Sequence, residues 1–492
     1  MAKKIAIIGA GVSGLTAGIY ALKAGFRAEI FERFTAPGGE MTGWDREDFH
    51  IDGCIHWLTG TADDPADAFN DMWKTVGMLG EGVEILKPET FGTFEHDGET
   101  FSFTRDVGET GSRMLEISEK DAPAIGAFVN EVKDFPYFSA PAVAVDCMSL
   151  SEKMKLLKTA GPALKAMKRL GKIPAAQFAE RFTHPLLRFA FKTWGADNAS
   201  VGDFIYSYAV FCRGKTGVPA GGSRAAAERI AEKFLSMGGL IQYGAPVAKL
   251  PVVGKTASLI LADERWLNAD YIVPACDIHA TFGMLHEQYR DKRIEERDAA
   301  PAVYPLWASF LLSYAVDDKM ENIPKELTFK TQLAMADAPV SYLSYTAYAD
   351  QPAFAPEGKN IMQVQVPTNY EFWDKLYADK KEYAETKTRY GQEVLERVEE
   401  RVPALKGKLR LIDAATPKTW ERYTGAHKGS WMSWGAALGA KPMIHDGRVA
   451  GIDNLYMAGQ WLMPPGGLPA AITGKWAVQR IMRKEKRDYR GL

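Results

Sequence analysis

The sequence predicts an α/β fold in which parallel strands alternate with helices, and three observations support this prediction. Residues 4–8 form an apolar run typical of a buried strand, and they lead directly into Gly9-x-Gly11-x-x-Gly14. A helical segment over residues 15–23 follows the glycines, and a second apolar strand over residues 28–31 follows the helix. Glu32 ends that second strand, eighteen residues after the last glycine of the motif. Strands that alternate with helices in this way are typical of a parallel sheet.

The order of these parts is the fingerprint of a dinucleotide site. Gly9 permits the tight turn after the strand, Gly11 lets the backbone approach a pyrophosphate, and Gly14 lets the helix pack closely on the strand. The first turn of the helix attracts phosphate, because its N–H groups are free and its dipole is positive there. Glu32 is placed to accept hydrogen bonds from the ribose hydroxyls. A βαβ unit without a ligand is the alternative, and the complete order of parts favours the dinucleotide.

Length, composition and charge restrict the remaining function classes. A chain of 492 residues is too long for one ordinary core, so we expect two domains. Hydrophobic and charged fractions of 46% and 25% are normal for a soluble globular protein. A net charge of −2 argues against nucleic acid as a partner. The four cysteines, Cys54, Cys147, Cys212 and Cys276, lack metal-ligand spacing. We therefore expect no metal site, and reduced thiols in a cytoplasmic protein.

Membrane-spanning and targeting segments are not expected either. The apolar run behind the basic first residues carries the glycine fingerprint, so it is a strand and not a signal peptide. No apolar stretch is long enough to span a bilayer, and any membrane contact is therefore expected to be peripheral.

The later elements are predicted from hydrophobic period and from glycine or proline at their ends. The expected elements are a hairpin over 43–52, short strands over 92–103, a helix over 223–237, a strand over 240–243, a hairpin of 247–253 with 258–262, a strand over 271–273, a charged helix over 380–401, a strand over 455–458 and a helix over 470–484.

Three separated blocks keep the alternation of strands and helices. We expect them to form one Rossmann-like nucleotide-binding domain built from discontinuous segments, namely residues 1–70, 215–299 and 403–492. The intervening residues 71–214 and 300–402 lose this rhythm and are rich in aromatic side chains. We expect these two insertions to form an α+β substrate-binding domain.

Residues 151–173 form a basic amphipathic segment. One face of the expected helix is apolar and carries Leu156, Ala160, Ala163, Met167 and Leu170. Another face is cationic and carries Lys158, Lys165, Arg169 and Lys172. Such a helix can lie in a membrane interface, and an ordinary helix that covers the substrate domain has the same pattern. The pair Gly161-Pro162 leaves two shorter helices as an alternative to one long helix.

The motifs resemble those of the phytoene desaturase family of flavoproteins. That family also includes carotenoid cis–trans isomerases and retinol saturases, and it belongs to the wider flavin amine-oxidase-like group. Gly9-x-Gly11-x-x-Gly14, Glu32 and Pro37-Gly38-Gly39 are similar to its FAD motif, and Gly221-Gly222-Ser223 is similar to its second block. The segment from Leu455-Tyr456-Met457-Ala458-Gly459 through Gly466-Gly467-Leu468-Pro469-Ala470 resembles its carboxy-terminal flavin motif.

One segment and two single positions refine this resemblance. Asp52-Gly53-Cys54-Ile55-His56-Trp57 is similar to a pattern of retinol-saturase-like members, with Cys54 in place of a glycine and Trp57 in place of a tyrosine. Glu40 stands where most relatives carry arginine after the paired glycines. Gln460 stands where many flavoproteins carry an aspartate near the ribitol.

The resemblance implies FAD as the cofactor and implies a set of residues around it. Glu32 disfavours NADP, because its charge would repel a 2′-phosphate. By resemblance, Gly467 and Leu468 lie where the terminal helix points its amino end at the pyrimidine ring of the flavin. The residues expected to bind the cofactor are Gly9, Gly11, Val12, Ser13, Gly14, Glu32, Arg33, Gly38, Gly39, Glu40, Ile55, His56, Trp57, Val247, Gly459, Gln460, Gly467, Leu468 and Ala470.

The flavin is the reactive group in this interpretation, and His56 is the candidate catalytic side chain beside it. An imidazole suits proton donation or hydrogen bonding near neutral pH. A packed core histidine is the alternative for His56. His427 has a comparable claim, because its loop resembles a family segment near the flavin.

The implied function is an FAD-dependent oxidoreductase that adds or removes hydrogen across carbon–carbon double bonds of a hydrophobic polyene or isoprenoid. Three alternatives stay open: redox-neutral cis–trans isomerisation with reduced FAD, flavin amine oxidation, and non-enzymatic binding of a prenyl lipid by the same architecture. The expected partners are a hydrophobic small molecule and a membrane surface, without nucleic acid. The expected location is the cytoplasm, with membrane association as an option.

Overall fold

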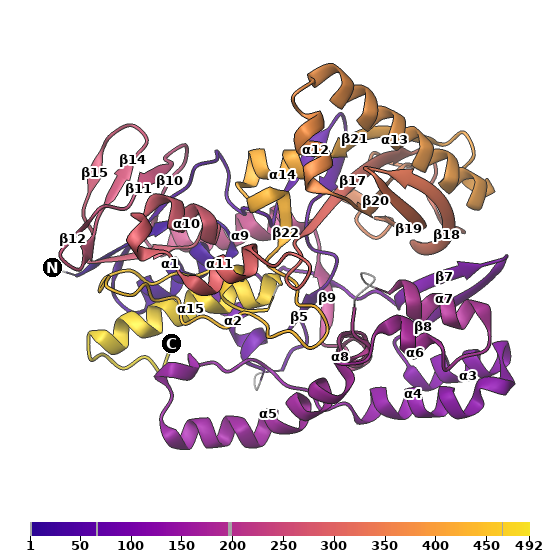
Figure 1. The fold of residues 1–492 in the computed structure, drawn as a ribbon, viewed down its shortest axis with the longest axis horizontal. Helices are drawn as coiled ribbons and strands as arrows, with labels where there is room; N and C mark the ends of the chain where they lie inside the picture. Colours follow the sequence, from indigo (N-terminus) through magenta and orange to yellow (C-terminus); the bar gives the residue numbers. More distant parts are fainter. Residues whose placement is uncertain (1, 65–66, 195–198, 465) are drawn as a thin grey trace.

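The fold is known from a computed structural model, which describes residues 2–64, 67–194, 199–464 and 466–492. Figure 1 shows the two ends of the chain on the left, where α1 and α15 lie together. The strands β17 to β21 and the helices α12 and α13 form the upper right part. The helices α3, α4 and α5 extend along the lower edge, and α6, α7 and α8 lie above them, below and beside β7 and β8.

A four-stranded parallel sheet forms the first layer and confirms the predicted α/β fold. Its order is β10 (Leu240–Gln242), β2 (Arg27–Phe31), β1 (Lys4–Ile8) and β16 (Tyr271–Pro274). These strands are short because both faces of the sheet are covered. One face packs against the layer formed by α1 (Val12–Lys23), α9 (Gly222–Ser236) and α15 (Gly467–Lys484), and α2 (Ala68–Val76) packs on α1 and α9. The other face packs against residues 245–261 and 278–285.

The strand predicted over residues 455–458 does not form as a regular strand. Leu455 makes one parallel bridge with Ile272, and Tyr456 makes one antiparallel bridge with Arg448, so the segment is not a regular strand. Its residues are apolar because they are buried beside β16, and burial alone produces the same sequence pattern as pairing.

An eight-stranded, mostly antiparallel sheet forms the second layer. The strand order is β21 (Leu409–Ala415), β17 (Trp307–Val316), β20 (Asn360–Pro367), β19 (Ala338–Ala347), β18 (Glu326–Met335), β7 (Thr90–His96) and β8 (Glu99–Thr104), with β22 (Ser430–Met432) paired to β17. The helix α13 (Lys380–Arg401) packs against β21 and β18 with Tyr390, Val394 and Val398 on its buried face. The other helices on this side are α12 (Tyr370–Leu376) and α14 (Pro417–Thr424).

The strand β21 lies beyond the domain boundary expected at residue 402, yet it is hydrogen-bonded to β17. We therefore propose that the second insertion extends through residue 415. The two insertions meet in one sheet, because β7 from the first pairs in parallel with β18 from the second.

Helices of the first insertion surround an aromatic core next to β7 and β8. The core includes Phe103, Phe128, Phe191, Phe204 and Tyr208, all buried. The helices are α3 (Val107–Ile117), α4 (Ala122–Asp134), α5 (Leu150–Leu170), α6 (Ala175–Ala179), α7 (Pro185–Thr193) and α8 (Val201–Cys212).

The amphipathic segment forms one helix, α5, with Pro162 inside it, so the alternative of two shorter helices is wrong. Its predicted apolar face packs against the protein: Ala160, Ala163 and Leu170 are buried. Figure 1 shows α5 at the lower edge of the molecule. A different stripe of this helix is exposed, with Leu150, Met154, Leu157 and Leu164 exposed by 78%, 59%, 60% and 55%.

The remaining elements are short. They are the hairpin β3 (Gly43–Arg46) with β4 (Phe49–Asp52), the set β5 (Leu58–Thr59), β9 (Thr216–Pro219) and β6 (Ile85–Leu86), the set β11 (Val247–Lys249), β14 (Leu259–Leu261) and β15 (Trp266–Leu267), the pair β12 (Val252–Val253) and β13 (Thr256–Ala257), and the helices α10 (Ile278–Met284) and α11 (Lys292–Asp298). The hairpin predicted over 43–52 forms as β3 with β4, and the hairpin predicted for 247–253 with 258–262 forms as β11 with β14. Within the described ranges, no helix is both long enough and apolar enough to cross a bilayer.

Candidate functional site

A large cavity opens where β1, β2 and β16 end. Its volume is about 1790 Å³, which exceeds the range of roughly 300–1,000 Å³ that holds one drug-sized ligand. Its walls come from the glycine turn after β1, residues 36–42, residues 54–59, α8, the segments 431–442 and 459–464, and residues 466, 469 and 470. A ligand site at the carboxyl ends of parallel strands is the usual position in open α/β folds.

The glycine motif shapes one end of this cavity as the sequence predicts. Gly9 has a φ of 101°, in the region that favours glycine. A side chain at Gly14 would place its Cβ only 2.0 Å from the carbonyl oxygen of Gly9, so the helix can pack on the turn only with glycine there. Gly11 makes a parallel bridge with Gly38, and this bridge joins the two glycine segments into one backbone cradle.

Glu32 is buried in the cavity wall at the end of β2. Its Oε2 accepts the backbone N–H of Ala10 and its Oε1 accepts that of Phe34, each at 2.7 Å. Each carboxylate oxygen can accept more than one hydrogen bond, so Glu32 keeps acceptor capacity for a ligand. The two bonds from the backbone fix the direction in which the carboxylate points.

Most of the predicted cofactor residues line this one cavity. They are Gly9, Gly11, Val12, Ser13, Glu32, Arg33, Gly38, Gly39, Glu40, Ile55, His56, Trp57, Val247, Gly459, Gln460 and Ala470. Gly14 lies behind the wall, in the packing position described above. Gly467 and Leu468 begin α15, and of these two residues only the backbone is described.

Glu40 and Gln460 form a pair in the cavity wall, although the chain positions are far apart. The side-chain Nε2 of Gln460 donates to Oε2 of Glu40 at 2.7 Å. Burial and the negative charge of Asp277 raise the pKa of Glu40 to about 8. Glu40 therefore holds a proton at neutral pH, and a neutral carboxyl does not repel a phosphate.

A buried hydrogen-bond network positions the loop that carries His56 and Trp57. Oδ2 of Asp52 accepts the backbone N–H of Ser223, and Oδ1 of Asp52 accepts the Ser223 hydroxyl, both at 2.6 Å. The Ser223 Oγ in turn accepts the backbone N–H of Ile55 at 2.7 Å. The second glycine motif thus acts through Ser223, which ties the start of α9 to the loop.

His56 and Trp57 face the lumen of the cavity. Desolvation by the surrounding protein lowers the pKa of His56, although the nearby charge of Asp52 opposes the shift. Trp57 packs edge to face on Phe91, with ring centroids 5.6 Å apart. His56 is therefore an accessible, mainly neutral imidazole at neutral pH.

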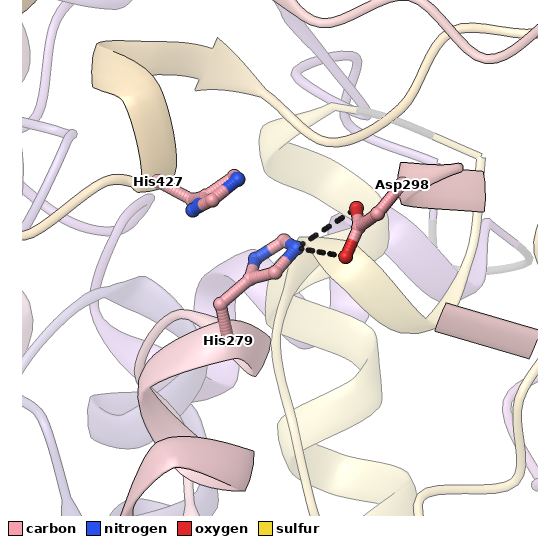
Figure 2. Close-up of side chains that lie close together, drawn as sticks. All are labelled: His279, Asp298 and His427. Carbon is pink, nitrogen blue, oxygen red and sulfur yellow. Dashed lines mark hydrogen bonds and ion pairs between the residues drawn. The ribbon is translucent and has the colours of Figure 1, made fainter. Parts of the chain in front are cut away.

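His427 is not among the residues that line the cavity, although Thr424 and Ala426 of the same loop line it. Figure 2 shows His427 beside His279, with the rings stacked at 3.7 Å, and Asp298 on the far side of His279. Burial lowers the pKa of His279, but its bonds to Asp277 and Asp298 outweigh this effect and raise the pKa to about 9. Burial and the neighbouring His279 lower the pKa of His427.

Two polar residues of the site, Asp203 and Ser207, escaped the sequence reasoning. They project from one face of α8 into the cavity, and only the fold shows that this face meets the cavity. Tyr206, Trp431 and Trp434 also line the cavity, and they belong to aromatic runs, residues 204–211 and 431–434, for which the sequence leaves a substrate tunnel and a packed core as alternatives. Asp277 lies just after β16, as Glu32 lies just after β2, so its position at a strand end was a usable signal.

Comparison with known families and sequences agrees with this geometry. Residues 7–76 match the family described as NAD(P)-binding Rossmann-like domain. The chain is 24% identical to the chloroplastic prolycopene isomerase of Daucus carota, over 96% of this chain and 79% of that protein. It is 24% identical to the lycopene-forming phytoene desaturase of Pseudescherichia vulneris, over 98% of this chain and 99% of that protein. The predicted resemblance is therefore confirmed over nearly the whole chain.

Solved structures share the fold along the whole chain. An oxidoreductase from Methanosarcina mazei matches with a TM-score of 0.60 at 18% identity, covering 98% of this chain and 100% of that one. A redesigned putrescine oxidase matches with a TM-score of 0.58 at 14% identity, covering 98% of this chain and 99% of that one. A CLA-producing fatty acid isomerase from P. acnes matches with a TM-score of 0.53 at 14% identity, covering 97% of this chain and 98% of that one. These likenesses concern the fold.

Proposed function

We propose that this chain, which resembles phytoene desaturases and prolycopene isomerases over nearly its whole length, is an FAD-dependent enzyme that changes carbon–carbon double bonds in a long hydrophobic polyene or isoprenoid. The observation that carries the proposal is the single cavity of about 1790 Å³, which combines a glycine cradle with an apolar, aromatic wall. Such a volume is large enough for a dinucleotide and a second ligand together.

The residues present fit FAD. The backbone cradle of Gly9, Gly11 and Gly38 suits a pyrophosphate, and Glu32 has acceptor capacity for ribose hydroxyls. Beyond this cradle, Gly466, Pro469 and Ala470 bring the amino end of α15 to the cavity, where its dipole favours a negatively charged ring. A nicotinamide nucleotide has no use for this second helix end, and the negative Glu32 would repel the 2′-phosphate of NADP.

When bound, FAD would supply the exchange of hydride with the substrate. The chain would contribute position, exclusion of water and one proton-handling group. Trp57, Trp431 and Trp434 provide an apolar lining, and His56 is the titratable side chain that we assign to proton transfer or hydrogen bonding at the substrate. Ser223 and Asp52 would hold the His56 loop in place through the network described above.

Isomerisation without net redox change is the second candidate, because one relative named above is a prolycopene isomerase. Amine oxidation has only fold similarity in its favour. A non-enzymatic lipid carrier would leave the dinucleotide cradle without use. A protein that remains colourless after incubation with FAD would favour the carrier.

The binding test compares two neighbouring glutamates, Glu29 within β2 and Glu32 just after it. Glu32→Gln removes the charge in the cavity wall. Glu29→Gln removes a charge outside the cavity, where Glu29 pairs with Lys4 of β1. After gel filtration with FAD, we expect a bound flavin spectrum in the original chain and in Glu29→Gln, and at least tenfold weaker binding in Glu32→Gln. Equal FAD retention in both variants would contradict the assignment of Glu32.

We also propose that α5 rests on an anionic membrane surface from which a hydrophobic substrate enters. The exposed stripe of Leu150, Met154, Leu157 and Leu164 is flanked by exposed lysines, Lys158, Lys165 and Lys168. Exposed apolar residues between lysines are typical of a helix that lies in the interface. The inner side of the same helix places Met167 in the cavity wall, so the surface and the site are adjacent.

A vesicle experiment tests this surface with a matched control. Leu157→Glu with Leu164→Glu should weaken sedimentation with phosphatidylserine vesicles by about tenfold or more for each leucine, because each buried leucine is worth about 1.5–3 kcal/mol. Leu235→Glu changes an exposed leucine on α9 and should bind as the original chain does. Binding that survives the double substitution would contradict the role of α5.

Four free cysteines, all within the described ranges, support a reducing cytoplasmic location for the protein.

A further inference from the structure

A group of side chains with metal-ligand chemistry lies just outside the cavity wall. His279 comes from α10, Asp298 is the last residue of α11, and His427 begins the turn after α14 (Figure 2). One ligand atom of each of these three residues lies within 4.8 Å of the other two. Nε2 of His279 lies 3.1 and 3.2 Å from the two carboxylate oxygens of Asp298. Nothing in the proposed function uses these three side chains.

A second set of contacts orients the three residues. Nδ1 of His279 lies 2.9 Å from Oδ1 of Asp277, and Oδ2 of Asp277 accepts the backbone N–H of His427 at 2.9 Å. The indole N–H of Trp434 donates to Asp298 at 3.1 Å. A histidine whose Nδ1 meets a carboxylate presents Nε2 outward, and this arrangement is typical of histidines that bind metals.

The charge and the donor atoms of the cluster fit a divalent transition metal. Two imidazoles and one carboxylate are the ligand types that Zn²⁺ and Co²⁺ accept in tetrahedral sites, where a water completes the set. The carboxylates of Asp277 and Asp298 flank His279, and a divalent cation that replaces the Nε2 proton of His279 keeps positive charge between them. Asp298 has 37% of its side chain exposed, so an ion can reach the cluster from solvent.

Binding requires that Nε2 of His279 releases the proton that it shares with Asp298, and it requires one movement, which concerns His427. Its ring is stacked on that of His279 at an angle of 16°, whereas a metal lies in the plane of each ring that binds it. The half-buried ring of His427 must therefore turn about its side-chain bonds to share an ion with His279. The backbone anchor on Asp277 is independent of that rotation.

We propose that His279, Asp298 and His427 bind one divalent transition metal ion of the Zn²⁺ type. The ion would connect α10 and α11 to the turn His427–Gly429, which leads into β22 and the cavity residues Trp431 and Trp434. It would therefore act as a structural link that holds this wall of the cavity, outside the space proposed for FAD.

The test uses Co²⁺ as a visible probe on the full chain freed of metal. We expect one Co²⁺ per chain with the visible absorption of a tetrahedral nitrogen and oxygen site, and displacement of Co²⁺ by equimolar Zn²⁺. Asp298→Asn keeps an acceptor for Trp434 but removes the charge, and His427→Gln removes the second imidazole. Each should weaken binding at least tenfold. His96→Ala removes a histidine that pairs with Asp97 elsewhere and should bind Co²⁺ as the original chain does.

Each outcome decides the proposal. Loss of the Co²⁺ spectrum in the two cluster variants, with unchanged circular dichroism, and its retention in His96→Ala supports the site. Absence of the spectrum in the original chain overturns the site, and so does equal binding by all variants. A rise of the melting temperature with Zn²⁺, present in the original chain and absent in Asp298→Asn, is a readout that does not depend on FAD or on turnover.

Discussion

Asp52 organises the site from a buried position. Its carboxylate accepts the N–H and the hydroxyl of Ser223 and the backbone N–H of Cys54. A side chain at Gly222 would place its Cβ only 2.0 Å from Oδ2 of Asp52, and the φ of Gly222 is 68°, so glycine is needed where the carboxylate meets α9. One acid thus connects β4, α9 and the loop before His56.

We expect Asp52→Asn to lower the free energy of unfolding by about 1–3 kcal/mol, because an amide offers one oxygen where the carboxylate uses two. Chemical denaturation measures the change. Asp48→Asn alters an exposed acid in the turn of the same hairpin and should stay within about 0.5 kcal/mol of the original chain. Equal stability of the two variants would mean that the hydrogen-bond network of Asp52 adds nothing to the free energy of unfolding.

Glu40 predicts a pH dependence of stability. Its pKa is about 8 in the folded chain and ordinarily 4.5, so the folded state holds a proton that the unfolded state releases between these values. Stability from this group is therefore present at low pH and is lost as the pH rises from 4.5 to 8. Glu40→Gln should flatten this part of the stability curve in the cofactor-free protein, as measured by denaturation at several pH values. An unchanged slope would contradict the shifted pKa.

His56 predicts a pH dependence of turnover. Desolvation lowers its pKa, so the protonated form is populated only at acid pH, and proton donation should become faster as the pH falls. His56→Gln should reduce turnover by about 10²- to 10⁴-fold and remove this dependence while FAD content stays constant. A variant with the original pH profile would exclude His56 from proton transfer.

At the scale of elements, the predictions from sequence succeeded where local pattern determines structure. The bounds of β1 and α13 match the prediction, because an apolar run beside glycine and a long charged run without a breaker each favour one structure. The outer stripe of α5 was missed, because α5 carries two apolar stripes and only the packing on α8 shows which one is covered.

Pairings between distant segments could not be predicted in the same way. The parallel contact of β7 with β18 joins residues more than two hundred positions apart, and no local period encodes it. The cluster of His279, Asp298 and His427 could not be predicted either. Its residues have no metal-ligand spacing in the sequence, and only the fold brings them together. The glycine motif and Glu32 were predictable because one βαβ unit contains all of them.

Pro162 allows a prediction at this scale. Proline removes one N–H from the helix ladder and strains the preceding turn, at a cost of roughly 3 kcal/mol in a helix interior. Pro162→Ala should therefore slow amide hydrogen exchange in the middle of α5, because this exposed residue loses little packing when it is changed. Lys165→Ala, another exposed position on α5, should leave the exchange rates nearly unchanged. Faster exchange in Pro162→Ala would contradict the argument.

At the scale of the whole molecule, the cavity lies where the parts of the chain meet. The parallel sheet supplies the cradle, α8 of the first insertion supplies one wall, and the segments around Trp307 and Trp431 supply another. Because these walls come from separate regions, a ligand that spans the cavity should tie them together. We expect saturating FAD to raise the melting temperature of the full chain, as linkage requires for any ligand that binds only the folded state.

The most direct test of the central claim is the product mass from an anaerobic reaction of the FAD-loaded protein with a long polyene, using either oxidised or pre-reduced flavin. We predict a product from the polyene in one of the two reactions. Its mass would be two units lower after desaturation, two units higher after saturation, or unchanged with a new geometry after isomerisation. Recovery of the unaltered polyene from both reactions, together with bleaching of the flavin by an amine, would contradict the account.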